Sequence, residues 1–201
     1  MHISEGVLAP GVLIAGGVFT AAGVALGVKK LRQEDIPKAS VLTSAFFVAS
    51  FIHIPAGVAS VHLVLNGVMG LFLGWAAFPC FLVALALQAV MFQFGGLTTL
   101  GVNTFNMAIP AILSYYLFRK MILNGNGTLQ MIGGFLCGFS SVLGGTFLIG
   151  ISLYFSGEGF LHAASIVAFS HIPVMIIEGI VTAMTLSFVC KVKPEMLEVN
   201  G

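Results

Sequence analysis

Charged residues are scarce in this sequence. Asp, Glu, Lys and Arg make up 7% of the 201 residues, whereas hydrophobic residues make up 58%. Soluble domains carry about 25% charged residues, so this chain has too few to cover a water-facing surface. The mean hydropathy of +1.08 agrees with that conclusion. The composition therefore excludes a soluble enzyme, a disordered chain and a collagen-like chain, and it indicates a protein that lies in a lipid bilayer.

Three other features are weak or absent in this sequence. The formal net charge is only +1, so the chain offers no strongly basic field and we expect no nucleic-acid partner. Three cysteines are too few for a disulfide framework. The sequence contains no G-x-x-x-x-G-K-[ST] loop to cradle phosphates. We therefore expect no bound nucleotide and no power source for transport within the chain itself.

The few charges that are present predict the membrane topology. All eight basic residues fall within 29–38, 119–120 and 191–193, and no charged residue occurs in 39–118 or 121–157. Basic clusters close to membrane spans stay in the cytoplasm. If all three clusters are inside, an even number of crossings separates each from the next, and about 20 residues per crossing leave room for four and then two. One crossing before the first cluster gives seven.

The sequence thus predicts an all-α polytopic membrane protein with an outer amino terminus and a cytoplasmic carboxyl terminus. A single integral membrane domain is expected over 1–201, with 1–7 as a terminal segment. Residues 1–28 are not expected to be a removed signal peptide, because positive charges follow the apolar run. The third to fifth helices are short and must be wrapped by protein. The helices are expected at about 8–28, 39–54, 61–76, 79–95, 105–119, 129–155 and 162–190.

This topology places every histidine toward the outer side. His2, His53, His62 and His162 fall at the outer face, and His171 lies about 13 Å into the last helix from that side. Imidazole is the commonest transition-metal ligand near neutral pH. The distribution predicts a metal or proton site that opens outward.

The first two residues form a candidate metal chelate. The α-amine of Met1, the peptide nitrogen of His2 and an imidazole nitrogen of His2 can bind one ion through a five-membered and a six-membered ring. One further imidazole completes a square of four nitrogens, which favours nickel(II) or copper(II). We expect Met1 to begin the mature protein, because removal of an initiator Met requires a small residue after it.

A fourth ligand is expected from the segment that joins the second and third helices. His62 is the candidate, with Ser60 and Asn66 placed to orient its ring through hydrogen bonds. The residues alone do not choose His62 over His53 or His171 as this ligand. For His53, a wetted position at the membrane interface is the favoured alternative.

Polar residues deeper in the predicted helices are candidates for a metal path or for helix packing. His171 and Glu178 are spaced i, i+7, so they share one face of the last helix. A Glu at mid-membrane is costly and should face the interior, where it either joins helices or serves transport. Asn103 and Asn106, together with Gln88 and Gln93, also need partners inside the bundle.

Four segments resemble the CbiM/NikM family of substrate-capture components of energy-coupling-factor transporters for nickel and cobalt. They are "MHISEGVL", "SVHLVLNG", "GVNTFNMAIPA" and "HIPVMIIEGIVTA". The resemblance implies that Met1 gives its amine, His2 its backbone and ring nitrogens, and His62 its imidazole to one divalent ion. It also implies a terminal segment that tucks into a seven-helix bundle. Because "HLVLNG" stands where other members read "SHPTGTG", the chain resembles the nickel branch more than the cobalt branch.

The resemblance also implies partners and a location. These are a transmembrane coupling protein, a pair of cytoplasmic ATPases and a small auxiliary membrane subunit, in the cell membrane of a prokaryote. The transported substrate is Ni(2+) or Co(2+), and no enzymatic activity is implied. Small residues at 21, 23, 25 and 27 are a candidate docking stripe, although packing within the bundle is the favoured explanation.

Three alternatives remain open. One is a cobalt-specific capture component that feeds cobalamin synthesis. Another is a membrane haem or metal enzyme that uses His62 and His171 as ligands, although the H-E-x-x-H signature of a metalloprotease is absent from the sequence. The third is a purely structural membrane subunit, in which alanine at His2 or His62 leaves metal uptake intact.

Overall fold

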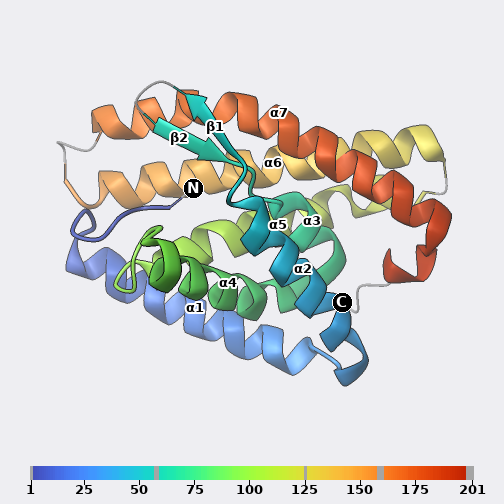
Figure 1. Ribbon diagram of the computed structural model, residues 1–201, viewed down its shortest axis with the longest axis horizontal. Coiled ribbons are helices and arrows are strands. Elements are labelled where there is room, and N and C mark those ends of the chain that lie inside the picture. The colour runs from blue at the N-terminus through green and yellow to red at the C-terminus, as the bar shows by residue number, and fades with distance from the viewer. Residues whose placement is uncertain (1, 57–58, 125, 158–160, 198–201) are drawn as a thin grey trace.

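The computed structural model describes residues 2–56, 59–124, 126–157 and 161–197, and only the backbone for the described parts of 53–62 and 161–164. Seven α-helices and one β-hairpin lie in the described residues (Figure 1). Three short 3-10 turns connect or follow them, at Gln33–Asp35, Gly74–Ala76 and Pro194–Leu197. The helices and strands are α1 Pro10–Lys30, α2 Ile36–Ala49, β1 His53–Ala56, β2 Ala59–His62, α3 Asn66–Leu73, α4 Ala77–Phe92, α5 Leu100–Ile122, α6 Gly127–Tyr154 and α7 Leu161–Val192.

Each predicted helix has a counterpart, and the long ones agree best. Helices α1, α6 and α7 begin and end within about two residues of their predicted bounds. Helix α5 begins at Leu100, five residues earlier than the predicted 105. The glycines that suggested an irregular segment, Gly95 and Gly96, form only the turn before it, with φ of 75° and 159°. Glycine adopts these angles without strain, so the chain turns sharply and the helix starts at once.

The prediction for the third helix was wrong in its first half. Residues predicted as helix from 61 include the end of strand β2, so His62 ends a strand and does not begin a helix. The helix itself, α3, covers Asn66–Leu73 only, and all eight of its residues are buried. A short apolar run such as residues 61–65 fits a strand as well as a helix by pattern alone. Pairing with β1 decides between them, because it gives the backbone hydrogen-bond partners within the protein.

The hairpin is the one departure from the predicted all-α class within the described residues. Strands β1 and β2 pair antiparallel, with His53 opposite His62 and Ala56 opposite Ala59. Strand β2 contacts α7, and the hairpin lies over α7 and α6 in Figure 1. Helix α2 has 14 residues and α3 has eight, so each is shorter than the roughly 20 residues that a crossing needs. The burial of α3 agrees with the expectation that short helices are wrapped by protein.

The remaining helices pack closely through small residues. Helices α6 and α7 lie along each other, α5 packs on α6, and α1 packs on α5 and α4. A Cβ atom on Gly23 would lie 2.4 Å from the Phe78 ring, and one on Gly27 would lie 2.5 Å from the Trp75 carbonyl oxygen. The favoured explanation for the small-residue stripe, packing within the bundle, is thus confirmed for its glycines. Ala21 and Ala25 are exposed on the other side of α1.

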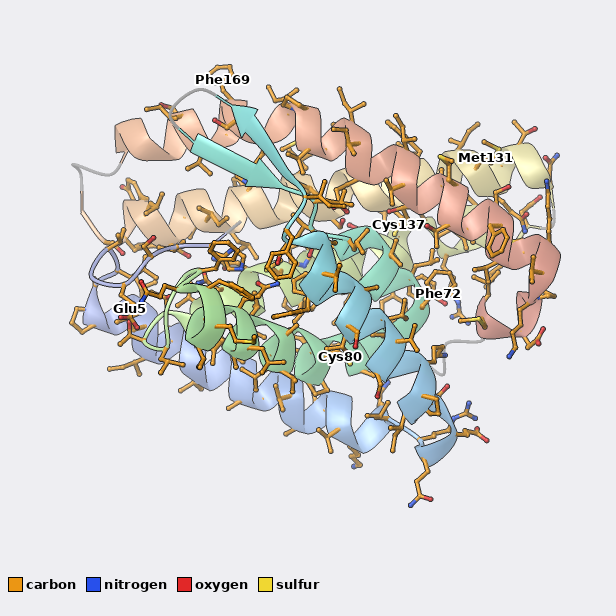
Figure 2. The ribbon with its side chains drawn as sticks, viewed as in Figure 1. Glu5, Phe72, Cys80, Met131, Cys137 and Phe169 are labelled. Carbon is orange, nitrogen blue, oxygen red and sulfur yellow. The ribbon has the colours of Figure 1, made fainter. Side chains whose placement is uncertain are left out.

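The outer surface of the bundle is apolar. Large side chains such as Phe169, 74% exposed, point away from the helices, whereas Phe72 and Cys137 lie inside (Figure 2). A soluble protein rarely exposes such a continuous apolar surface, but acyl chains cover it readily. Among the described residues, four helical segments are long and apolar enough to cross a membrane: Pro10–Lys30, Asn66–Phe92, Gly127–Tyr154 and Ser165–Val192. The seven predicted crossings and their direction stay predictions.

Candidate metal centre

The terminal segment before α1 is held by the first turns of α5. Asn103 is 2% exposed, and its side-chain oxygen accepts a hydrogen bond from the Ile3 backbone N–H at 3.0 Å. The same side chain donates from its nitrogen to the Ile3 carbonyl oxygen at 3.1 Å. Thr99 donates its hydroxyl to that carbonyl at 2.9 Å. Asn103 therefore hydrogen-bonds both the N–H and the carbonyl oxygen of Ile3, as the backbone of a neighbouring strand does. These bonds fix the position of the chain next to His2.

Two further contacts hold the segment along its length. The Glu5 carboxylate accepts a hydrogen bond from the Thr98 backbone N–H at 3.1 Å, just before α5 begins. The Ala9 backbone N–H donates to the Ser156 hydroxyl at 3.1 Å, after the end of α6. Figure 2 shows Glu5 at the end of the bundle where α1 starts. The segment thus lies across the start of α5, anchored at three separate points.

The His2 ring is oriented by Gln88 on α4. Its Nε2 atom lies 2.9 Å from the Gln88 side-chain oxygen. An amide oxygen only accepts, so Nε2 carries the proton and Nδ1 is the nitrogen with a lone pair for a metal. Nδ1 is also the nitrogen that closes a six-membered ring with the backbone nitrogen of the same residue. Burial lowers the pKa of His2 to about 3, so the imidazole is neutral at physiological pH. Nδ1 then carries no proton that a metal would have to displace.

We expect Gln88→Leu to weaken nickel binding about 10-fold, because the hydrogen bond from Nε2 to Gln88 is lost and no longer favours one tautomer of the ring. Nitrogen chemical shifts of the His2 ring should change from a single tautomer to a mixture, and a nickel titration measures the affinity. Gln88→Glu keeps an acceptor oxygen and should keep both properties. A leucine variant with unchanged shifts and affinity would show that Gln88 does not orient the ring.

Several residues that the sequence singled out lie outside the described part of the chain. They are the predicted ligand Met1 and the side chains of the predicted ligand His62, of His53 and His162, and of Ser60, which was expected to orient His62. The backbone nevertheless shows that His53 and His62, which the sequence left as alternatives, are directly paired in the hairpin. Among the described residues, no three His, Cys, Asp or Glu side chains gather into a metal-binding group.

Three of the other candidates have hydrogen-bond partners of their own within the helix bundle. The Asn106 side chain donates to the Ser152 hydroxyl at 3.4 Å, so it joins α5 to α6. His171 lies deep in α7, and its Nδ1 lies 2.6 Å from the Val167 carbonyl oxygen of the same helix. Glu178 is fully buried, as expected, but its carboxylate meets backbone N–H groups at the start of α3. Asn66 is also buried, in the first turn of that helix.

Sequence reasoning missed Thr99 and gave Gln88 no specific role. Thr99 and Asn103 are spaced i, i+4 and share a helix face, which was a usable signal. The sequence gave no signal that Gln88 meets His2 across 86 residues.

The geometry defines a class of protein: a multi-pass membrane protein in which the segment before α1 is folded against α5 and holds the His2 ring next to Gln88. Comparison with known proteins gives the particular family. The chain belongs to the CbiM family, whose model, described as a cobalt uptake substrate-specific transmembrane region, matches residues 2–196. The relatives are prokaryotic transport proteins, so the chain is a prokaryotic multi-pass membrane protein.

Individual relatives match over nearly the whole chain. A protein of Haemophilus influenzae named for metal transport is 42% identical, over 98% of this chain and 97% of its own length. A fused NikMN protein of Archaeoglobus fulgidus, named for nickel transport, is 28% identical over 98% of this chain and 68% of its own length. A crystal structure of a transition metal transporter has a TM-score of 0.76 at 26% identity, covering 96% of this chain and 93% of that chain.

Proposed function

We propose that this protein is the substrate-capture component of an energy-coupling-factor importer for nickel or cobalt. The ion binds on the outer side to four nitrogens: the Met1 amine, the His2 backbone nitrogen, His2 Nδ1 and the His62 imidazole. The observation that carries the proposal is the double hydrogen bond of Asn103 to Ile3, which fixes the chain one residue after the chelating pair. The orientation of the His2 ring by Gln88 supports the same ligand set.

Nickel is the proposed preferred substrate. A planar set of four nitrogens suits nickel(II), and nickel(II) stands above cobalt(II) in the general order of affinities. The names of relatives support both metals, cobalt through the family and nickel through the Archaeoglobus fulgidus protein. A competition experiment, in which the purified protein is offered both ions and the bound metal is analysed, should recover mainly nickel.

The proposed topology is seven crossings with the amino terminus outside. Helix α2 with the hairpin makes the second crossing. The third is made by the whole stretch 63–76, which includes the buried α3, because α3 alone is shorter than a crossing. The basic ends of α1, α5 and α7 lie toward one side of the bundle in Figure 1, which supports a common cytoplasmic side for them. Labelling of single cysteines by a membrane-impermeant reagent, one introduced near residue 4 and one near residue 31, tests this direction.

The proposed partners supply the energy. They are a transmembrane coupling protein, a pair of cytoplasmic ATPases and a small auxiliary membrane subunit. The protein itself binds metal outside, reorients and releases the ion inside. Nickel uptake by cells that hold the assembled complex should be lost in the His2→Ala and His62→Ala variants. Intact uptake in both variants would favour a purely structural subunit.

A further inference from the structure

Glu178 is a fully buried carboxylate in the middle of the longest helix, α7. One of its oxygens, Oε1, accepts two hydrogen bonds, from the Val64 N–H at 2.5 Å and from the Leu65 N–H at 2.6 Å. The other, Oε2, has no hydrogen-bond partner within the part of the chain that the structure describes. Ion pairs among the described residues are confined to 32–38, so none reaches this carboxylate. A charged group so deep in a bilayer is costly, which indicates that its contact with the Val64–Leu65 turn has a function.

The turn that Glu178 holds is itself strained. Leu65 has φ of 53° and ψ of 25°, a left-handed conformation that is rare for residues with a branched side chain. It persists only where surrounding contacts hold it, and such residues cluster at functional sites. The Leu65 carbonyl oxygen accepts the Met69 N–H at 2.9 Å, so the same residue starts α3. The Glu178 carboxylate therefore lies at the positive end of α3 and satisfies N–H groups that the helix leaves open.

The turn also connects α3 to the end of β2. Only Leu63 separates His62, the last residue of β2, from Val64. Two residues of extended chain span at most about 7 Å, so the position of Val64 limits where His62 can lie. Strand β2 contacts α7 as well, so the hairpin and the turn rest on the same helix.

We propose that Glu178 is a positioning residue for the fourth metal ligand, because its carboxylate holds the Val64–Leu65 turn and thereby sets the place of His62 relative to the Met1–His2 chelate. This inference rests on the proposed function, since it assigns Glu178 to the same metal site. It also chooses between the two roles that the sequence left open for Glu178. The carboxylate acts through the backbone, and it does not touch the ion.

A double-mutant cycle tests the proposal on the full chain in detergent or nanodiscs. Nickel affinity and the electronic absorption of the bound nickel are measured for Glu178→Ala, His62→Ala and the double variant. We expect Glu178→Ala to weaken binding about 10-fold to 100-fold, the range for groups that orient a ligand. The double variant should bind no more weakly than His62→Ala alone, since Glu178 acts only through that ligand. The absorption of the Glu178→Ala complex should shift toward that of the His62→Ala complex.

Thr182→Val is the matched control. Thr182 lies one turn further along α7 and is fully buried like Glu178, and its hydroxyl has no hydrogen-bond partner among the residues described. This variant should keep the nickel affinity and spectrum of the parent protein. Glu178→Gln keeps an acceptor oxygen and should retain most of the affinity.

Additive losses in the double variant, or an unchanged affinity in Glu178→Ala, would overturn the inference. If Glu178→Ala does not elute as a folded protein, Glu178→Asp replaces it in the cycle, because the shorter side chain keeps the charge but withdraws the acceptor from the turn. The same weaker and non-additive binding is then expected, and additivity contradicts it. Failure of the proposed function can be distinguished from failure of this inference. If the proposed ligand set is wrong, the His62→Ala variant itself binds nickel with full affinity.

Discussion

A flexible extension of many residues placed before Met1 is expected to weaken nickel binding by more than about 100-fold, the upper range for a group that only orients a ligand. The extension turns the α-amine into a peptide nitrogen and carries the new amine far from His2, so no terminal amine can close a ring with the His2 backbone nitrogen. The extension does not alter the two hydrogen bonds between Asn103 and Ile3, so the folded segment is expected to keep its position. Isothermal titration of the purified protein with nickel measures the loss.

The matched control is the same extension built as a protease site that leaves Met1 as the first residue after cleavage. Cleavage should restore the parent affinity, and the same extension at the carboxyl end should have no effect. Undiminished nickel affinity in the uncleaved protein would remove the α-amine from the ligand set.

Asn103→Leu is expected to weaken nickel binding about 10-fold to 100-fold, as loss of an orienting group does. Leucine has a similar size but removes the acceptor of the Ile3 N–H, and an unsatisfied buried group costs about 1–3 kcal/mol. The Ile3 carbonyl loses one of its two donors and keeps the Thr99 hydroxyl. The terminal segment then leaves its position across α5, and the chelating pair moves with it. Nickel titration measures the affinity, and limited proteolysis measures the release of the segment.

Asn106→Leu is the control for this prediction. Asn106 lies one turn further along α5 and is equally buried, at 3% exposed against 2% for Asn103, but its partner is Ser152. The control variant should keep the parent affinity to within about twofold, because separate sites of this kind act independently. Equal losses in both variants would mean that Asn103 acts through general stability of the helix bundle.

The long helices were predictable because their signals are local. Apolar runs of membrane length locate α1, α6 and α7, and basic residues mark the ends of α1 and α7. These local signals explain the close agreement of their bounds. The hairpin and α3 were not predictable in this way. Their backbone hydrogen bonds depend on a partner strand and on Glu178, which is 113 residues away from Leu65 in the sequence.

The candidate site shows the same contrast between local signals and contacts that join distant parts of the sequence. The chelate stays a prediction, which the sequence allows because it needs only two adjacent residues. The inward-facing side of α7 was predictable from the spacing of His171 and Glu178, and both residues are buried. The hydrogen bonds that hold the terminal segment in place could not be predicted. Asn103 meets Ile3 across 100 residues, and no periodic pattern encodes such a contact.

X-ray absorption spectroscopy of the nickel-loaded protein tests the four-nitrogen chelate most directly. The account predicts a planar set of four nitrogen ligands in the parent protein and a changed set when a flexible extension of many residues precedes Met1. A six-coordinate shell made mainly of oxygen atoms, or the same spectrum with and without the extension, would contradict it.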